Sequence, residues 1–291
     1  MTFFSSLKNS YRKAGTKKLA LSLLFLLAIA FNLSQTIDTS SKHYIDKAFN
    51  RALITFGIAK TLNGVISVAQ GTEIAIQPAG IGINLTPGQI LDPVNDLVER
   101  FSWIMLASTT SLGIQKVFLT MSIWPNFNYF FIFIIALGLI LIFTKNRLQL
   151  RTFVLRLSLL LIILRFAVPF TGLANEYIYQ VFLESEYTTS TEQLETTAFE
   201  IGQLNETEQV SLPDIKEKSV WESAKAYYNS TSEMLDINKK IEKYKLAATE
   251  TTHHIVNLIV VFLFQTIIIP LAFIFIIYAL FRYIIKLDFI N

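Results

Sequence analysis

The sequence predicts an all-α polytopic membrane protein with four transmembrane helices, an extracytoplasmic coiled-coil-like helical hairpin and a small β-hairpin. Hydrophobic residues make up 52% of the 291 residues. Charged residues make up 16%, against about 25% in an average soluble domain. Several apolar stretches approach the roughly 20 residues that a helix needs to cross a bilayer. Basic clusters separate these stretches, and their distribution sets the expected orientation.

The N-terminus combines a cationic segment with a short apolar one. Residues 1–18 form a basic cytoplasmic N-terminus, and residues 19–33 (LALSLLFLLAIAFNL) follow as transmembrane helix 1. This order is typical of a signal sequence, and Ala28-Ile29-Ala30 resembles a cleavage site. We interpret the segment as an uncleaved signal anchor. The basic residues that precede it are Lys8, Arg12, Lys13, Lys17 and Lys18.

Three later stretches complete the predicted membrane domain. They are residues 127–144, 152–171 and 254–281. The loop 145–151 between the first two carries Lys145, Arg147 and Arg151, and the C-terminus 282–291 carries Arg282 and Lys286. The positive-inside rule then places this loop and both termini in the cytoplasm. The expected location is a plasma membrane, the bacterial inner membrane, with regions 34–126 and 172–253 outside.

Two further segments, 52–69 and 101–124, leave a six-span alternative open. If one of them crossed alone, the basic loop 145–151 would move outside, so both cross, both dip partway into the membrane, or neither crosses. The first segment has helical spacing of apolar residues opposite polar ones, which favours an amphipathic helix on the membrane surface. The apolar residues are Ile54, Ile58, Leu62, Val65 and Ala69, opposite Thr55, Asn63 and Ser67.

The region 34–126 is therefore expected to lie outside or on the membrane surface. Residues 72–86 alternate apolar and small or polar residues around Pro78-Ala79-Gly80, which predicts a β-hairpin. Asp92 and Pro93 predict an N-cap and first helical position for a helix from about Val94. Its expected apolar face consists of Val94, Leu97, Phe101, Ile104 and Met105, and the expected membrane-interface anchors are Trp103, Phe118 and Trp124.

Region 172–253 is acidic and predicts a helical hairpin with a heptad-like stripe on its second helix. The stripe packs either on the preceding arm, residues 174–204, or on a neighbouring subunit. Helices joined by short loops usually pack together, which favours the first reading. The stripe residues predicted to make hairpin or oligomer contacts are Val220, Ala224, Tyr227, Met234, Ile237, Ile241 and Tyr244.

Arg165 is the most unusual residue for a membrane span, because an intramembrane charge costs at least about 2.5 kcal/mol and usually faces protein or water. None of the four predicted spans contains Asp or Glu. The partners expected for Arg165 are therefore His254, Asn257 and Gln265, which share one face of the last span. These four residues form either a polar seam or pore wall that favours anions, or a packing contact. Pro169 and Pro270 are expected to kink their helices.

No motif predicts catalysis, a metal site or a cofactor. The chain has no cysteine, which excludes disulfides and cysteine-ligated metals. It also lacks the calcium-loop, phosphate-loop, HExxH and GxSxG patterns. His253 and His254 are adjacent, so they point about 100° apart on a helix and form a poor metal pair. We expect a non-enzymatic protein that binds no nucleic acid.

Three functions are compatible with these features. The first is an oligomeric pore- or channel-like assembly formed through membrane and extracytoplasmic helices. The alternative is a structural or assembly subunit of a larger envelope complex, and the second alternative is a lipid-acting membrane enzyme. The expected partners are the lipid bilayer, further copies of the chain and other envelope membrane proteins.

Overall fold

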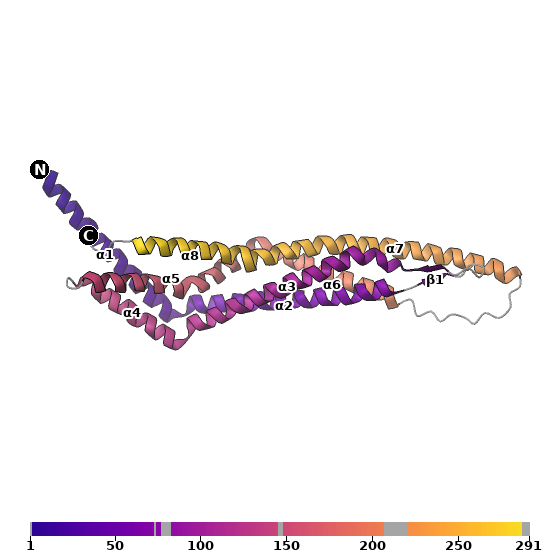
Figure 1. The fold of residues 1–291 in the computed structure, drawn as a ribbon, viewed down its shortest axis with the longest axis horizontal. Helices are drawn as coiled ribbons and strands as arrows, with labels where there is room; N and C mark the ends of the chain where they lie inside the picture. Colours follow the sequence, from indigo (N-terminus) through magenta and orange to yellow (C-terminus); the bar gives the residue numbers. More distant parts are fainter. Residues whose placement is uncertain (1, 73, 77–82, 145–147, 207–219, 287–291) are drawn as a thin grey trace. The chain divides into compact units, whose positions relative to one another are not determined.

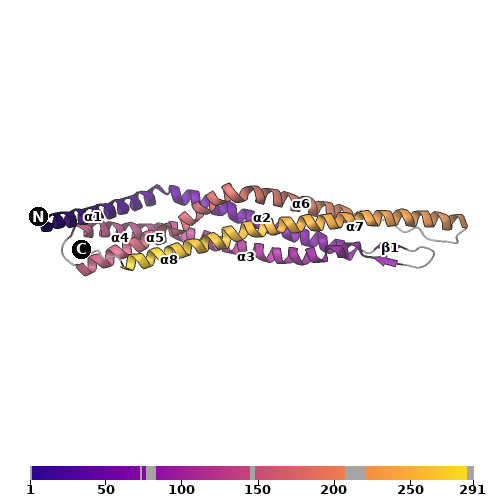
Figure 2. The same ribbon diagram turned by 90° about the horizontal axis from the view of Figure 1, so that it is seen from above.

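The computed structural model describes residues 2–72, 74–76, 83–144, 148–206 and 220–286 (Figures 1 and 2). Side chains at 2–15, 17, 74–76, 83–85, 148, 205–206 and 220–237 are not described. Within these described residues the regular structure is helical apart from two three-residue strands, which confirms the all-α fold class. It divides into two compact units. Unit 1 comprises Met1–Phe49, Thr110–Tyr179 and Gln265–Asn291, and unit 2 comprises Asn50–Thr109 and Gln180–Phe264.

Unit 1 is built mainly from apolar helices. Its elements are α1 (Thr2–Ser34), the first part of α2 (Thr36–Gly71), the last part of α3 (Asp92–Ile123), α4 (Pro125–Phe143), α5 (Leu148–Ile178) and α8 (Ile269–Lys286). Gln35 separates α1 from α2 with a left-handed backbone, φ 51°, which a non-glycine residue adopts at some cost. Pro125 is the first residue of α4, where its missing N–H has no helical acceptor to lose.

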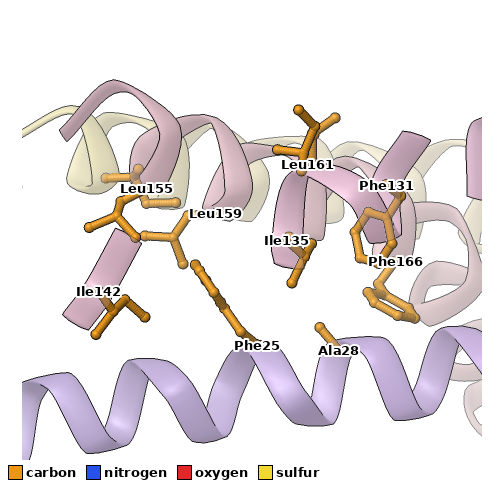
Figure 3. Packing of buried hydrophobic residues seen from close by; sticks show 11 residues of the cluster. Phe25, Ala28, Phe131, Ile135, Ile142, Leu155, Leu159, Leu161 and Phe166 are labelled. Carbon is orange, nitrogen blue, oxygen red and sulfur yellow. The ribbon is translucent and has the colours of Figure 1, made fainter. Parts of the chain in front are cut away.

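The hydrophobic core of unit 1 joins α1, α4, α5 and α8 (Figure 3). α1 contributes Phe25 and Ala28, and α8 contributes Ile284. The backbones of α4 and α5 come close at Gly138, where an added Cβ would lie 2.6 Å from the Ser158 hydroxyl and 2.9 Å from the Phe25 ring. The other core residues are Phe131, Ile134, Ile135 and Ile142 from α4 and Leu155, Leu159, Leu161 and Phe166 from α5.

Unit 2 contains the rest of α2 and α3, the short helix η2 (Pro87–Leu91), α6 (Glu184–Glu206) and α7 (Val220–Leu263). α6 and α7 lie side by side in both views (Figures 1 and 2). The buried stripe of α6 repeats every three or four residues and includes Ser190, Leu194, Thr197 and Ile201. On α7, Tyr244 is buried and Ile241 is half-buried, whereas the side chains of the other predicted stripe residues lie outside the described ones.

Two short strands connect α2 to η2. β1 (Ile74–Ile76) pairs antiparallel with β2 (Ile83–Leu85), and the register sets Ile74 opposite Leu85. The predicted turn Pro78-Ala79-Gly80 lies outside the described residues. η2 then packs closely on α2, because a Cβ at Gly88 would overlap the Ala69 carbonyl oxygen at 1.9 Å. Glycine is therefore required at this crossing.

The structure corrects two local predictions in unit 2. The predicted stripe on α2 is confirmed at Ile58, Leu62 and Ala69, which are buried, and is wrong at its first position. Ile54 is 55% exposed, whereas Thr55 is fully buried and its hydroxyl donates to the Arg51 carbonyl. This internal bond removes the cost of burying the Thr55 donor. Asp92 has helical dihedrals and belongs to α3, and its carboxylate accepts a hydrogen bond from Gln70 at 2.7 Å rather than capping the helix.

Four described helical stretches are long and apolar enough to cross a membrane. They are Thr36–Gly71, Pro125–Phe143, Gln149–Leu204 and Asn238–Lys286. Pro125–Phe143 covers the predicted span 127–144 except its last residue, and the last two stretches contain the predicted spans 152–171 and 254–281. The predicted first span corresponds to the shorter apolar helix Lys18–Ser34, whereas Thr36–Gly71 contains the ambiguous segment 52–69. The chain is thus of the multi-pass helical membrane type. Two criteria differ over the first span: length and hydropathy favour Thr36–Gly71, whereas the basic residues before 19–33 favour that shorter segment.

Candidate functional site

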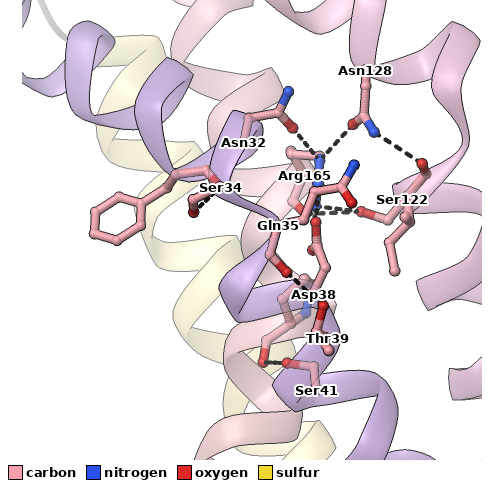
Figure 4. Close-up of polar contacts among 12 residues, drawn as sticks. Asn32, Ser34, Gln35, Asp38, Thr39, Ser41, Ser122, Asn128 and Arg165 are labelled. Atoms are coloured by element: carbon pink, nitrogen blue, oxygen red, sulfur yellow. Dashed lines mark hydrogen bonds and ion pairs between the residues drawn. The ribbon is translucent and has the colours of Figure 1, made fainter.

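The candidate site is a buried cluster around Arg165 in unit 1, which we call the arginine cluster: Arg165, Asp38, Asn32, Asn128 and Ser122 (Figure 4). Its five residues come from five helices, α5, α2, α1, α4 and α3. Asn32 and Asp38 lie on either side of the α1–α2 turn at Gln35. Ser122 and Asn128 lie on either side of the α3–α4 turn at Trp124 and Pro125. Two helix–helix turns therefore supply the partners of one side chain.

The hydrogen bonds of Arg165 satisfy its guanidinium group on three sides. Nη1 donates to Asp38 Oδ1 at 2.9 Å and Nη2 donates to Asp38 Oδ2, so the ion pair is bidentate. Nε donates to Asn32 Oδ1 at 2.9 Å and to Asn128 Oδ1 at 3.0 Å. Arg165 is fully buried and the Asp38 side chain is 5% exposed. The cluster therefore holds a compensated charge pair that solvent scarcely reaches.

A proline-induced gap in α5 explains the role of Ser122. Pro169 has no N–H, so the carbonyl of Arg165, four residues earlier, loses its helical donor. The Ser122 hydroxyl donates to this carbonyl at 2.9 Å, and it also accepts from Arg165 Nη1 at 3.3 Å. One turn further along α2, Ser41 donates to the Pro169 carbonyl at 2.6 Å. The gap in α5 is thus filled by α3, and α2 adds a hydrogen bond to the proline's own carbonyl.

The last helix repeats this arrangement at Pro270. The carbonyl that Pro270 leaves without a helical donor is that of Thr266, and Ser111 of α3 donates to it at 3.1 Å. Asn175 of α5 donates to the neighbouring Gln265 carbonyl at 3.3 Å. Residues Phe264–Ile268 form a π-helical segment, η4, in which the usual backbone bonds are shifted. Serines of α3 therefore close both proline gaps.

Within unit 1, the hydrogen bonds of Arg165 go to residues other than the predicted His254, Asn257 and Gln265. Its counter-ion is Asp38, which the sequence analysis placed beyond the first span, and its other contacts come from Asn32, Asn128 and Ser122. Gln265 belongs to unit 1, where it is fully buried and neither amide atom has a hydrogen-bond partner in the described part of the chain. His254 and Asn257 belong to unit 2.

In unit 2, His254 and Asn257 join α6 and α7. His254 Nδ1 lies 3.2 Å from the Ser190 hydroxyl, and Asn257 donates to Glu186 at 3.0 Å. Tyr187, between these α6 residues, packs edge-on against Phe262 of α7, with ring centroids 6.1 Å apart. These contacts describe an interhelical seam, and the buried Ser190 hydroxyl is not exposed to a substrate.

The arginine cluster suits helix assembly better than chemistry. Asp38 is saturated by the guanidinium, and no group of three or more His, Asp or Glu residues in the described chain is arranged to hold a metal ion. No family model, curated protein or solved structure matches this chain. The sequence signal that finds Asp38 is its position five residues after the predicted end of the first span at residue 33.

Proposed function

We propose that this chain is a non-enzymatic membrane protein that assembles with further copies of itself through α7 of unit 2, as a structural element of a membrane complex. The observation that carries the proposal is the unequal length of the two helices in the α6–α7 hairpin. The arginine cluster supports it indirectly, because its role in joining five helices is structural.

The contacts between α6 and α7 fix their register. Ser190 faces His254 and Glu186 faces Asn257, so the helices run antiparallel. Glu206, the last residue of α6, lies 16 residues after Ser190, and the same number of residues before His254 leads to Asn238. Since α7 begins at Val220, its first 18 residues, Val220 to Ile237, extend past the level at which α6 ends (Figures 1 and 2). This extension is about 27 Å long.

The extension continues the heptad-like spacing of the hairpin. Apolar or small residues recur every three or four positions, at Val220, Ala224, Tyr227, Thr231, Met234 and Ile237. Such a stripe is stabilised when it packs on another helix, and the described part of α6 reaches only to the level of Asn238. A second copy offers the same stripe at the same height above the membrane, so two extensions can pair in register. We therefore assign the stripe to self-association.

Single-cysteine crosslinking tests this assignment, because the chain has no cysteine of its own. Ala224→Cys and Tyr227→Cys lie on the stripe, whereas Glu222→Cys and Asn229→Cys lie on the opposite face of the helix. Oxidation in native membranes should give covalent dimers at the two stripe positions and severalfold less at the control positions. Equal yields at all four positions, or adducts only with a different protein, would contradict self-association.

The proposed topology has four spans, with both termini in the cytoplasm and regions 34–126 and 172–253 outside. α1 then crosses as the first span despite its short apolar part. If α2 crossed as well while α3 did not, the loop 145–151 would be separated from the basic N-terminus, against the positive-inside rule. α3 is not among the described stretches that are apolar enough to span. The regular burial of α2 at Thr55, Ile58, Leu62, Ile66 and Ala69 suits a helix packed within unit 2.

Ion conduction is a second candidate function. It is favoured by Gln265 and Asn175, whose buried Oε1, Nε2 and Oδ1 atoms have no hydrogen-bond partner in the described chain. Such atoms would be satisfied by water in an oligomer that opened a path beside η4. Arg165 gives this candidate no support, because Asp38 neutralises its charge. Liposomes containing the purified protein should then pass ions, and Gln265→Leu should reduce the flux; electrically silent liposomes would reject it.

A further inference from the structure

The end of α4, the start of α5, the end of α8 and the middle of α1 contribute to one hydrophobic core in unit 1. Ile142, near the end of α4, packs in the same cluster as Leu155, near the start of α5 (Figure 3). Ile284, near the end of α8, belongs to this cluster, and Leu21 of α1 packs against it. Leu155, Ile284 and Leu21 lie within one or two turns of basic residues on their own helices. We call this region, with Lys18, Arg151, Arg282 and Lys286, the cationic end.

Negative charge is sparse around the cationic end. The sequence contains no Asp or Glu in residues 1–37, 100–175 or 251–287, and Asp288, two residues after Lys286, lies outside the described residues. Asp38 and Asp46 form ion pairs with Arg165 and Lys116, so neither of these pairs neutralises a member of this group. Lys18, Arg282 and Lys286 are exposed, and the buried Nε of Arg151 has no hydrogen-bond partner among the described residues. Lys8, Arg12, Lys13, Lys17, Lys145 and Arg147 add further positive charge in the adjoining sequence.

We propose that the cationic end binds the headgroups of anionic phospholipids. The exposed apolar residues beside it, such as Leu19, Leu23 and Tyr283, place it where an apolar helix surface meets a charged rim. Lipid acyl chains would cover the apolar helix surface, while headgroup phosphates would approach the charged rim. Anionic lipid surfaces attract such juxtamembrane cations. Arg151 adds a directed donor, since guanidinium groups bind phosphate with defined geometry.

The test uses the full-length protein in nanodiscs of phosphatidylcholine, with or without phosphatidylglycerol. The test variant is Arg151→Gln/Arg282→Gln/Lys286→Gln. The control is Lys47→Gln/Lys243→Gln/Lys245→Gln, which removes the same charge from exposed lysines outside the cationic end. Thermal unfolding and the ratio of the two lipids retained by the protein are measured for each.

Phosphatidylglycerol should raise the unfolding midpoint of the wild type and the control, and each should retain it in preference to phosphatidylcholine. The test variant should lose most of both effects, at about fivefold in relative lipid affinity for each cation removed. Added salt should weaken the preference.

An equal lipid preference in all three proteins would overturn the proposal. The proposal would also be overturned if free glycerol phosphate, added to the wild type in pure phosphatidylcholine, raised the unfolding midpoint as much as phosphatidylglycerol does. The site would then recognise phosphate in solution rather than a lipid. A test variant that unfolds in pure phosphatidylcholine is replaced by the three single variants, each read by its retained lipid ratio.

Discussion

At the scale of single residues, Arg165 acts as half of a neutral pair. A lone guanidinium in an apolar bundle would be costly, and the bidentate contact with Asp38 removes that cost only while both partners are present. Asn32, Asn128 and Ser122 satisfy the remaining directions of the guanidinium. The pair therefore specifies how α1 to α5 meet, and it offers no free charge to a passing ion.

Asp38→Asn should be strongly destabilising, because it leaves Arg165 charged and buried without its counter-ion. Removing one partner of a buried pair costs about 3–5 kcal/mol. The matched control is Asp46→Asn, which breaks an exposed pair with Lys116 and should cost at most about 1 kcal/mol. Denaturant unfolding of the protein in detergent measures both, and similar losses for the two variants would show that the buried pair has no special role.

The two proline gaps give a second prediction. Ser122→Ala leaves the Arg165 carbonyl without a donor and should cost about 1–3 kcal/mol. In a Pro169→Ala background the backbone N–H of residue 169 can bond to that carbonyl, so the same serine substitution should cost less. A double-mutant cycle from unfolding measurements gives the difference. Additive effects would mean that Ser122 does not compensate for the proline.

At the scale of elements, close packing between helices depends on where glycine stands. Gly138→Ala should destabilise the protein by about 1–3 kcal/mol, because its Cβ would overlap Ser158 and Phe25. Gly57→Ala is the control: it lies within α2, has no atom near its added Cβ, and should stabilise by about 0.5–1 kcal/mol. Opposite signs in thermal unfolding are expected, and a stabilising Gly138→Ala would contradict the packing described for α4 and α5.

The sequence predicted helices better than it predicted their faces. Composition and the apolar stretches were sufficient for the helical membrane fold, because they depend on the hydrophobic length of each segment. The buried face of α2 was predicted correctly at Ile58, Leu62 and Ala69. It was wrong at Ile54, because the burial of the neighbouring Thr55, whose hydroxyl bonds to its own helix, is not visible in hydropathy. Asp92 was assigned to a cap because the preceding η2 was not foreseen.

At the scale of the whole molecule, long-range pairing was the hardest feature to predict. Arg165 was recognised as unusual from its place in an apolar stretch, whereas its partner Asp38 lies 127 positions away in a different helix. The search for partners was limited to the predicted spans, and the turn at Gln35 brings a residue from outside them to the arginine. The serines of α3 were missed for the same reason. A proline in a helix shows that a carbonyl one turn earlier needs another hydrogen-bond donor, but the sequence does not show which residue supplies it.

The central claim is a four-span chain with α2, α3 and the intervening residues on the outer side of the membrane. Its most direct test is labelling of Gln77→Cys in intact cells, with Asn146→Cys in the loop 145–151 as the cytoplasmic control; the chain has no other cysteine. The account predicts that a membrane-impermeant maleimide reacts with Gln77→Cys and leaves Asn146→Cys unmodified until the membrane is opened. If Gln77→Cys reacts only with a membrane-permeant reagent, α2 and α3 cross the bilayer and the four-span account is contradicted.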